Sequence, residues 1–170
     1  MFLLQTPRGS SSFHLRKCRS TRGGRLLTLT STAHFIAPRP LRPPLARSPF
    51  GGRFIAISTM RAFEGWPGCA HAAAAKAGVM SLVRTLAIEW GGQGIRCNTI
   101  APGPIAGTEG VQRLYEAESK DNIQSQMAGT PLGRLGHTHD IANAALYLCA
   151  QTGDFITGTD LVVDGGRARL

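Results

Sequence analysis

The feature that most constrains this chain is the alternation of short apolar runs with longer helical patterns from Gly51 onward. Three runs have the length and composition of strands: residues 51–59, GGRFIAIST; residues 94–103, GIRCNTIAPG; and residues 160–166, DLVVDGG. Between them, residues 70–90 and 138–150 repeat small and apolar side chains at spacings of three and four. Strands that alternate with helices indicate an α/β fold with a parallel sheet.

Residues 51–170 provide too few strands for a complete doubly wound sheet. Three strands and two helices leave the first strand with an unpaired edge, which folded proteins avoid. We therefore expect an incomplete Rossmann-like doubly wound parallel sheet, of which this chain carries the C-terminal half. A segment that should precede Gly51 is expected to be missing.

Residues 1–50 differ in kind from residues 51–170, and we divide the chain at this point. The segment is rich in Arg, Ser, Thr and Pro, and five prolines fall between Pro38 and Pro49. Because proline lacks an amide hydrogen, we expect no regular helix or central strand there. We predict an irregular or disordered segment outside the sheet. A transit peptide, a wrongly joined gene segment and a basic disordered arm all fit this composition.

Charge and composition exclude several classes of partner and site. The net charge of +9 arises in residues 1–63, which hold eleven Lys and Arg and no acid, whereas residues 64–170 hold eight basic and ten acidic residues. The folded part therefore offers no footprint for nucleic acid. No apolar run approaches the roughly 18 residues of a membrane span. The four cysteines form no CxxC pair, so reduced thiols are expected rather than disulfides or a zinc site.

Four stretches of residues 51–170 resemble, in order and spacing, the C-terminal half of the short-chain dehydrogenases/reductases. They are GGRFIAIST, AAAAKAGVMSLVRTLAIEWGGQGIRCNTIAPGPI, PLGRLGHTHDIANAALYL and FITGTDLVVDGG. The N-terminal half of that family carries a TGxxxGxG phosphate turn and an NAG motif, and residues 1–50 contain neither. The resemblance implies a nicotinamide-dependent oxidoreductase.

Within this family, two features are similar to the 2,4-dienoyl-CoA reductases of peroxisomes. APGPIAGTEG, residues 101–110, is similar to their cofactor loop, and in HAAAAK the family's tyrosine, four residues before Lys76, is replaced by Ala72. The resemblance implies NADPH-dependent reduction of 2,4-dienoyl-CoA thioesters, a fatty acyl-CoA substrate class, in the β-oxidation of unsaturated fatty acids. FITG and DGGR are also similar to the trans-2-enoyl-CoA reductases, which stay an alternative. An inactive chain that keeps only subunit contacts is a third hypothesis.

The chemistry of a dienoyl thioester explains why a tyrosine can be absent. Reduction of a ketone places charge on an oxygen that must be protonated at once, and a phenol with a lowered pKa suits that task. In a dienoyl thioester, hydride adds at the chain end of the conjugated system, charge moves into an enolate, and a carbon is protonated. Hydrogen-bond donors near the thioester oxygen and a positioned water can then replace the phenol.

The resemblance assigns catalytic roles to Lys76, Thr59 and His71. Lys76 would hold the nicotinamide ribose hydroxyls and add positive potential. Thr59 lies thirteen residues before Ala72, the spacing of the family's catalytic serine, and would donate to the thioester oxygen with Ser58 beside it. His71 would act as a donor or hold a water. It lies about 140° around the helix from Lys76, so an ordinary structural histidine is an equal alternative.

The loop after the second strand is the expected cofactor site, because ligands bind beyond the carboxyl ends of strands in open α/β sheets. By resemblance, the backbone near Ile105 meets the nicotinamide amide and Thr108 reaches the phosphates. Arg113 falls at a position that contacts substrate in the dienoyl-CoA reductases, where an arginine suits an anionic CoA ester. The residues of this loop are Pro102, Gly103, Pro104, Ile105, Ala106, Gly107 and Thr108.

Three further features concern metal binding, backbone structure and cellular location. His137 and His139 flank a helix start, but no other ligands lie nearby in sequence, so no metal site is expected. Asn98 is interpreted as a structural residue that ties backbone near the loop. The chain ends in Ala-Arg-Leu, residues 168–170, a variant of the peroxisomal address SKL, which predicts a peroxisomal location. A cytoplasmic location, or an organelle reached by a transit peptide, stays an alternative.

The helix of residues 70–90 is also the expected subunit contact. Related enzymes pair through the equivalent helix, and here it is rich in alanine and carries Met80, Val83 and Trp90. We therefore predict a homo-oligomer that associates through this helix, with much of that apolar face exposed in an isolated chain.

Overall fold

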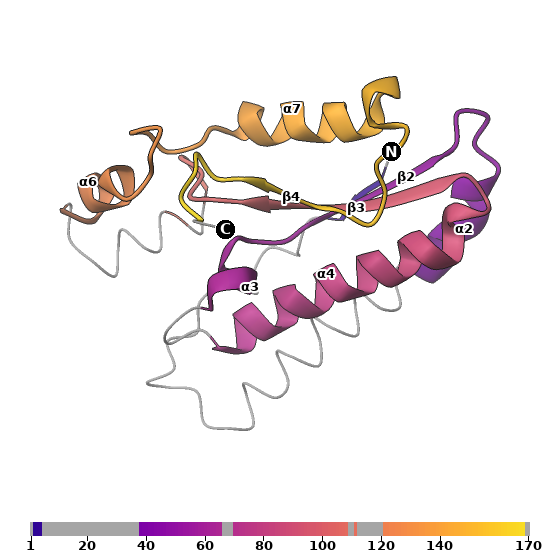
Figure 1. Cartoon of the computed structure of the whole chain (residues 1–170), viewed down its shortest axis with the longest axis horizontal. Helices are drawn as coiled ribbons and strands as arrows, with labels where there is room; N and C mark the ends of the chain where they lie inside the picture. Colours follow the sequence, from indigo (N-terminus) through magenta and orange to yellow (C-terminus); the bar gives the residue numbers. More distant parts are fainter. Residues whose placement is uncertain (1, 5–37, 66–69, 109–110, 112–120, 169–170) are drawn as a thin grey trace.

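Four parallel strands, covered by helices on both faces, form the core of the computed structural model, which describes residues 2–4, 38–65, 70–108, 111 and 121–168 (Figure 1). The strands lie in the order β1 (Phe2–Leu4), β2 (Gly52–Ile57), β3 (Ile95–Pro102), β4 (Asp160–Val163). The expected parallel α/β sheet is confirmed.

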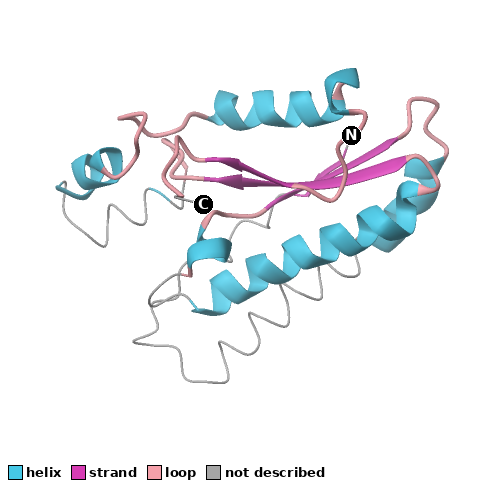
Figure 2. Cartoon of the chain, in the orientation of Figure 1, coloured by secondary structure: helices cyan, strands magenta, loops and turns pink. Residues whose placement is uncertain are grey.

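Among the described residues, two long helices and four shorter elements surround the sheet (Figure 2). The long helices are α4 (Ala70–Gly91) and α7 (Thr138–Cys149). The shorter elements are α2 (Pro38–Ala46), α3 (Arg61–Glu64), α6 (Asp121–Ala128) and the 3-10 turn η2 (Gln151–Gly153). Within the described ranges, no helix is long and apolar enough to cross a membrane.

The side chains of β2 alternate between two separate cores, as the period of a strand requires. Phe54 and Ala56 pack in the cluster beneath α4, whereas Ile55 and Ile57 pack with Leu148 on the α7 side. The apolar run of this strand is therefore buried on both faces, the pattern of a strand inside a parallel sheet.

The connections on either side of β3 have opposite handedness. β2 leads to β3 through α4, and β3 leads to β4 through α6 and α7. Both connections move one strand in the same direction along the sheet, yet α4 and α7 cover opposite faces (Figure 1). One of them therefore departs from the right-handed rule for parallel strands. The departure places a helix on each face of the sheet.

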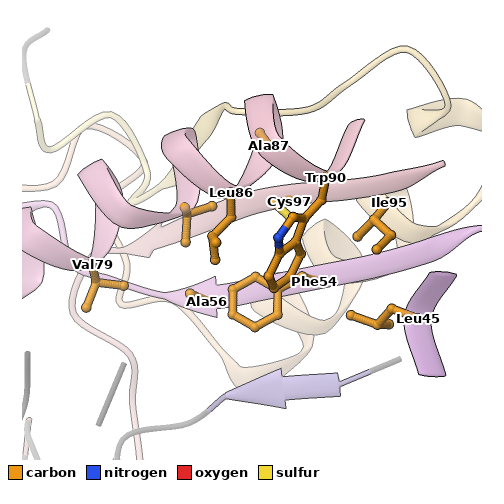
Figure 3. Packing of buried hydrophobic residues seen from close by; sticks show 10 residues of the cluster. Leu45, Phe54, Ala56, Val79, Leu86, Ala87, Trp90, Ile95 and Cys97 are labelled. Carbon is orange, nitrogen blue, oxygen red and sulfur yellow. The ribbon is translucent and has the colours of Figure 1, made fainter. Parts of the chain in front are cut away.

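The apolar stripe of α4 faces the sheet. Trp90 meets Phe54 edge to face, with ring centroids 6.3 Å apart and an interplanar angle of 74° (Figure 3). The prediction that Met80, Val83 and Trp90 form an exposed face was wrong, because each is 3% exposed or less. The sheet covers the apolar stripe of α4, so that stripe is not available to a second subunit. The exposed positions of α4 are small residues, two charged residues and one large apolar residue: Ala70, Ala74, Gly78, Ser81, Arg84, Thr85, Ile88, Glu89 and Gly91.

The expectation that residues 1–50 stay irregular and outside the sheet was wrong in two places. β1 pairs in parallel with β2, with Leu3 opposite Ile55. β1 pairs with backbone groups along the outer edge of β2, which would otherwise be unpaired. The second place is α2, which forms within the proline-rich stretch. The division of the chain at residue 50 into two units stays a prediction.

Packing explains how α2 tolerates Pro43 and Pro44. The φ angle of proline is compatible with a helix, so the cost lies in missing amide hydrogens and crowding of the preceding turn. Leu45 is only 5% exposed and joins the cluster beneath α4. A Cβ atom on Gly52 would lie 2.9 Å from the Cβ of Leu45, so the glycine lets α2 approach β2 closely. Burial of α2 offsets the lost hydrogen bonds.

Candidate functional site

Lys76 is the best-defined group of the candidate site. It lies in the second turn of α4, and its Nζ donates a hydrogen bond of 2.8 Å to the carbonyl oxygen of Ile57, the last residue of β2. Burial lowers the pKa of Lys76 from 10.5 to about 8. The Oγ of Ser58 donates to the backbone carbonyl of Lys76 over 3.3 Å. The end of β2 and the start of α4 are therefore joined by two hydrogen bonds around this lysine.

Thr59 lies two residues beyond the carbonyl that Lys76 binds. Its Oγ1 accepts a hydrogen bond of 3.3 Å from the Arg61 amide, which leaves the hydroxyl proton available to donate. The backbone pairing with β3 continues past the strand, because the Met60 amide donates to the Pro102 carbonyl at 3.3 Å. The structure thus brings Thr59 and the start of the predicted cofactor loop to one edge of the sheet.

His71 lies in the first turn of α4 and is half-buried. In the described part of the chain no hydrogen bond joins it to Lys76 or Thr59. The arrangement agrees with the helical spacing, which places the two side chains on different faces. Ala72, one turn before Lys76, lies on the same side of the helix as the lysine.

Residues 102–108, here called the cofactor loop, are fixed by backbone contacts. Gly103 donates its amide to the Val163 carbonyl at 3.0 Å, and Ile105 forms a bridge with Gly136. The Oγ1 of Thr108 donates to the Ile105 carbonyl at 2.7 Å, so it fastens the loop to itself. The loop is therefore an ordered structure at the carboxyl edge of the sheet, where ligands bind in this class of fold.

A cavity of about 220 Å³ lies between the cofactor loop and the start of α7, and the sequence analysis missed it. Arg134 holds Asp140 through two hydrogen bonds, of 2.8 and 3.1 Å, and the His137 amide donates to the same carboxylate at 2.7 Å. These contacts hold the pKa of Asp140 well below its usual range. The only sign of this cavity in the sequence was that Arg134 lies six residues before Asp140, an acid in the first turn of α7. The lining is Gly103, Pro104, Ile105, Leu132, Arg134, Gly136, Asp140, Asn143, Val163, Asp164 and Gly165.

Asn98 has the structural role expected of it. It is 1% exposed, its Nδ2 donates to the Ile156 carbonyl at 3.0 Å, and its Oδ1 accepts from the Thr159 amide at 3.1 Å. It ties β3 to the approach to β4. Arg113 and the last two residues, Arg169 and Leu170, lie outside the described residues, so their predicted roles stay predictions.

The described residues give no support for catalysis by a cysteine or for a metal site. Cys97 and Cys149 are free, and burial raises the pKa of the Cys97 thiol to about 12, so its reactive thiolate form is disfavoured. Among the described residues, no group of three or more His, Cys, Asp or Glu side chains is arranged to hold a metal.

A parallel sheet with helices on both faces, and with a partly buried lysine and an ordered loop at the carboxyl ends of its strands, is an α/β fold of Rossmann type. Residues 25–168 match a family model described as enoyl-(acyl carrier protein) reductase. The chain belongs to the short-chain dehydrogenase/reductase family. The match begins at residue 25, which lies inside the Arg-, Ser- and Pro-rich segment of residues 1–50.

Similar proteins include several named for one activity. A peroxisomal 2,4-dienoyl-CoA reductase of Pongo abelii is 36% identical over 160 residues, which cover 94% of this chain and 51% of that protein. A Bacillus subtilis protein named "Probable 2,4-dienoyl-CoA reductase" is 46% identical over 115 residues, 65% of this chain and 44% of that protein. The chain therefore spans about half the length of the curated relatives it matches.

Solved structures give the same fold. A candidate NAD(P)-dependent gluconate 5-dehydrogenase of Beutenbergia cavernae, with NADP at low occupancy, has a TM-score of 0.83 and 27% identity. The match covers 94% of this chain and 63% of that one. The expected Rossmann-like fold and the family resemblance are both confirmed.

Proposed function

We propose that this chain serves the NADP(H)-dependent reduction of 2,4-dienoyl-CoA thioesters. The observation that carries the proposal is a partly buried lysine bonded to the end of β2, with Ala72 in place of a phenol one turn earlier. This pair suits a substrate whose reduction ends in protonation of carbon rather than of a carbonyl oxygen. Relatives named for dienoyl-CoA reduction support the same substrate class.

The residues present fit a nicotinamide cofactor. The ammonium of Lys76 carries three hydrogens and gives one to Ile57, so donors remain for the ribose hydroxyls. The cofactor loop, from Pro102 to Thr108, would lie against the nicotinamide amide and the phosphates. When bound, the cofactor supplies the hydride. NADP rather than NAD is part of the proposal, and the NADP-bound structural neighbour supports it.

The protein residues act on the charge that forms in the substrate. As hydride adds to the end of the diene, an electron pair moves toward the thioester oxygen. The Thr59 hydroxyl would donate a hydrogen bond to that oxygen, and Lys76 would add positive potential. With a pKa of about 8, Lys76 is mostly protonated at neutral pH. A water, which His71 would help to hold, gives its proton to carbon and completes the reduction.

Substrate and location follow from the same proposal. A fatty acyl-CoA is strongly anionic, and Arg113 would contact it. Relatives from Saccharomyces cerevisiae and Danio rerio are named peroxisomal, which supports a role in peroxisomal oxidation of unsaturated fatty acids. The C-terminal Ala-Arg-Leu would be the address.

Turnover of purified protein tests the proposal. NADPH consumption is followed with a 2,4-dienoyl-CoA, a trans-2-enoyl-CoA and a simple ketone, at millimolar NADPH. We expect consumption with the dienoyl-CoA alone, reduced roughly tenfold to a thousandfold in Lys76→Ala, the scale of one electrostatic or positioning group. Arg42→Gln, which removes an arginine at the other edge of the sheet, should leave the rate unchanged. Preference for the enoyl-CoA would favour the alternative reductase, and no turnover with any substrate would contradict an enzymatic role.

A further inference from the structure

The cavity between the cofactor loop and the start of α7 has walls of closely packed backbone. Figure 1 shows the ends of β3 and β4 and the first turn of α7 at the same end of the sheet. A Cβ atom on Gly103 would lie 2.8 Å from the Cα of Asp164, and one on Gly136 would lie 2.5 Å from the Cδ1 of Ile105. Because these glycines have no Cβ, the segments around the cavity can approach this closely. The cavity is therefore a preformed feature of the fold.

Backbone groups in these walls are already hydrogen-bonded to one another. The Gly136 amide donates to the Pro104 carbonyl at 3.0 Å, and the Leu132 amide donates to the Gly165 carbonyl at 3.2 Å. All four residues line the cavity. These donors and acceptors hold the walls together, so recognition of a ligand depends chiefly on the side chains.

Among the described residues, four polar side chains line the cavity, and three of them have partners. Arg134 and Asp140 bond to each other at 2.8 and 3.1 Å, and Asp164 accepts two backbone amides of the turn after β4. Asn143 lies one turn after Asp140 on α7 and is exposed. Its side chain makes no hydrogen bond within the described part of the chain. The carboxamide of Asn143 can therefore donate to a ligand and accept from it.

Charge and size restrict what the cavity can hold. Arg134 carries a positive charge and Asp140 and Asp164 carry negative charges, so the lining side chains sum to −1. This balance disfavours a phosphate group. At about 30 Å³ for each water molecule, the 220 Å³ correspond to roughly seven waters, which is room for about seven non-hydrogen atoms. The apolar part of the lining is Pro104, Ile105, Leu132 and Val163.

A small, uncharged and mostly apolar group that contains one amide matches this lining. The end of an acyl-CoA next to the thioester is such a group, because an ethylene linker joins its sulfur to an amide and the phosphates lie at the far end. The cavity also lies beside the position proposed for the thioester. The Met60 amide, next to Thr59, donates to the Pro102 carbonyl at 3.3 Å. Gly103 follows in the chain and lines the cavity.

We propose that this cavity is the subsite for the amide nearest the thioester of the acyl-CoA substrate, and that Asn143 binds this amide. The identity of the ligand rests on the function proposed above. Occupation of the cavity by a small amide depends only on residues of this chain, so it can be measured without turnover. In the reaction, Asn143 sets how far the thioester extends toward Thr59.

An NMR titration of the labelled chain under reducing conditions, without cofactor, tests the proposal. The probe is N-acetylcysteamine, which contains the sulfur and the amide of that end of CoA. Nicotinamide and inorganic phosphate are titrated for comparison, because the cofactor also carries an amide and both CoA and the cofactor carry phosphates. The reporters are the amides of Gly136 and Gly165, which line the cavity, and the reference is the Thr99 amide, which donates to Thr159.

Two matched variants separate the role of Asn143 from a general effect on α7. Asn143→Leu keeps the approximate size of the side chain and removes its hydrogen-bonding groups. Gln151→Leu is the control, because it removes an exposed carboxamide, just beyond the other end of α7, that does not line the cavity.

We expect N-acetylcysteamine to shift both reporters in a saturable way, with Thr99 unchanged and a dissociation constant of about 1–10 mM, as suits so small a ligand. Asn143→Leu should weaken binding about threefold to tenfold, the scale of one hydrogen bond, and Gln151→Leu should not change it. Absence of saturable shifts, equal affinity in Asn143→Leu, or tighter binding of nicotinamide or phosphate at the same reporters would overturn the proposal. The turnover assay described above measures failure of the proposed function separately.

Discussion

At the scale of single residues, Lys76 combines two properties that are costly together, burial and a positive charge. The folded protein compensates with only one protein acceptor among the contacts described for its ammonium, the Ile57 carbonyl. A group kept in this state at the edge of a sheet suggests selection for function rather than stability.

The lowered pKa of Lys76 has a measurable consequence for stability. Because its pKa falls from 10.5 to about 8 on folding, the unfolded chain holds a proton between these values that the folded chain has released. Stability should therefore rise with pH across this window. Relative to Lys76→Met, the wild-type free energy of unfolding should increase by about 1–3 kcal/mol between roughly pH 7 and pH 10. Urea unfolding of both proteins measures it.

The comparison with Lys76→Met cancels other groups that titrate at high pH. Burial raises the pKa of Cys97 to about 12, which acts in the opposite direction in both proteins. A difference between the two proteins that stays constant with pH would mean that Lys76 is not desolvated in solution.

At the scale of elements, the success of sequence reasoning depended on how local the signal was. The strand that ends just before Thr59 and the helix around Lys76 were predicted because apolar periodicity reports burial directly. α2 was missed because proline statistics describe an isolated helix and not one packed through Leu45. The direction of the α4 stripe was also misjudged, since periodicity shows that a face is apolar but not what covers it.

Gly52 tests the packing of α2 on the sheet. A Cβ there would lie 2.9 Å from both Leu45 Cβ and Ile95 Cγ1. Gly52→Ala should therefore reduce the free energy of unfolding by about 1–3 kcal/mol through overpacking. Gly92→Ala, where a Cβ meets nothing within 4 Å, is the control and should change it by less than about 0.5 kcal/mol. Equal losses in urea unfolding would show that α2 does not pack in this way.

The outward face of α4 is where we still propose self-association. It presents small residues, which allow two helices to approach closely, and Ile88, 84% exposed, beside the charged Arg84 and Glu89. Ser81→Arg should shift the protein to monomer in light scattering at micromolar concentration without loss of helix content. Ala142→Arg, on the exposed side of α7, should not. A monomeric wild type, or equal effects of both variants, would count against this contact.

At the scale of the whole molecule, the candidate site was predicted only in part. The family resemblance assigned roles to Thr59 and Lys76, and the structure places both at the carboxyl edge of the sheet. The cavity at Arg134 and Asp140 was not foreseeable, because it depends on how α7 lies over the cofactor loop.

Cofactor affinity is the property that tests the chain as a unit. The sequence contains no TGxxxGxG turn, the element that binds phosphates in this family. Titration of the 170-residue protein with NADPH, followed by fluorescence, should therefore give a dissociation constant of about 1 mM or weaker. Lys76→Ala should weaken it further. Micromolar affinity would show that phosphate binding is supplied by residues other than that turn.

The order of the strands also sets a sequence of events during synthesis. β3, the most deeply buried strand, is complete at Pro102, but its second neighbour begins only at Asp160. At typical translation rates the ribosome needs on the order of 3–12 s to make the intervening stretch. For that time one hydrogen-bonding edge of β3 has no native partner, and its apolar α7-side face has no cover. Newly made chains are therefore most vulnerable to misassociation in this interval, and chaperone binding should concentrate there.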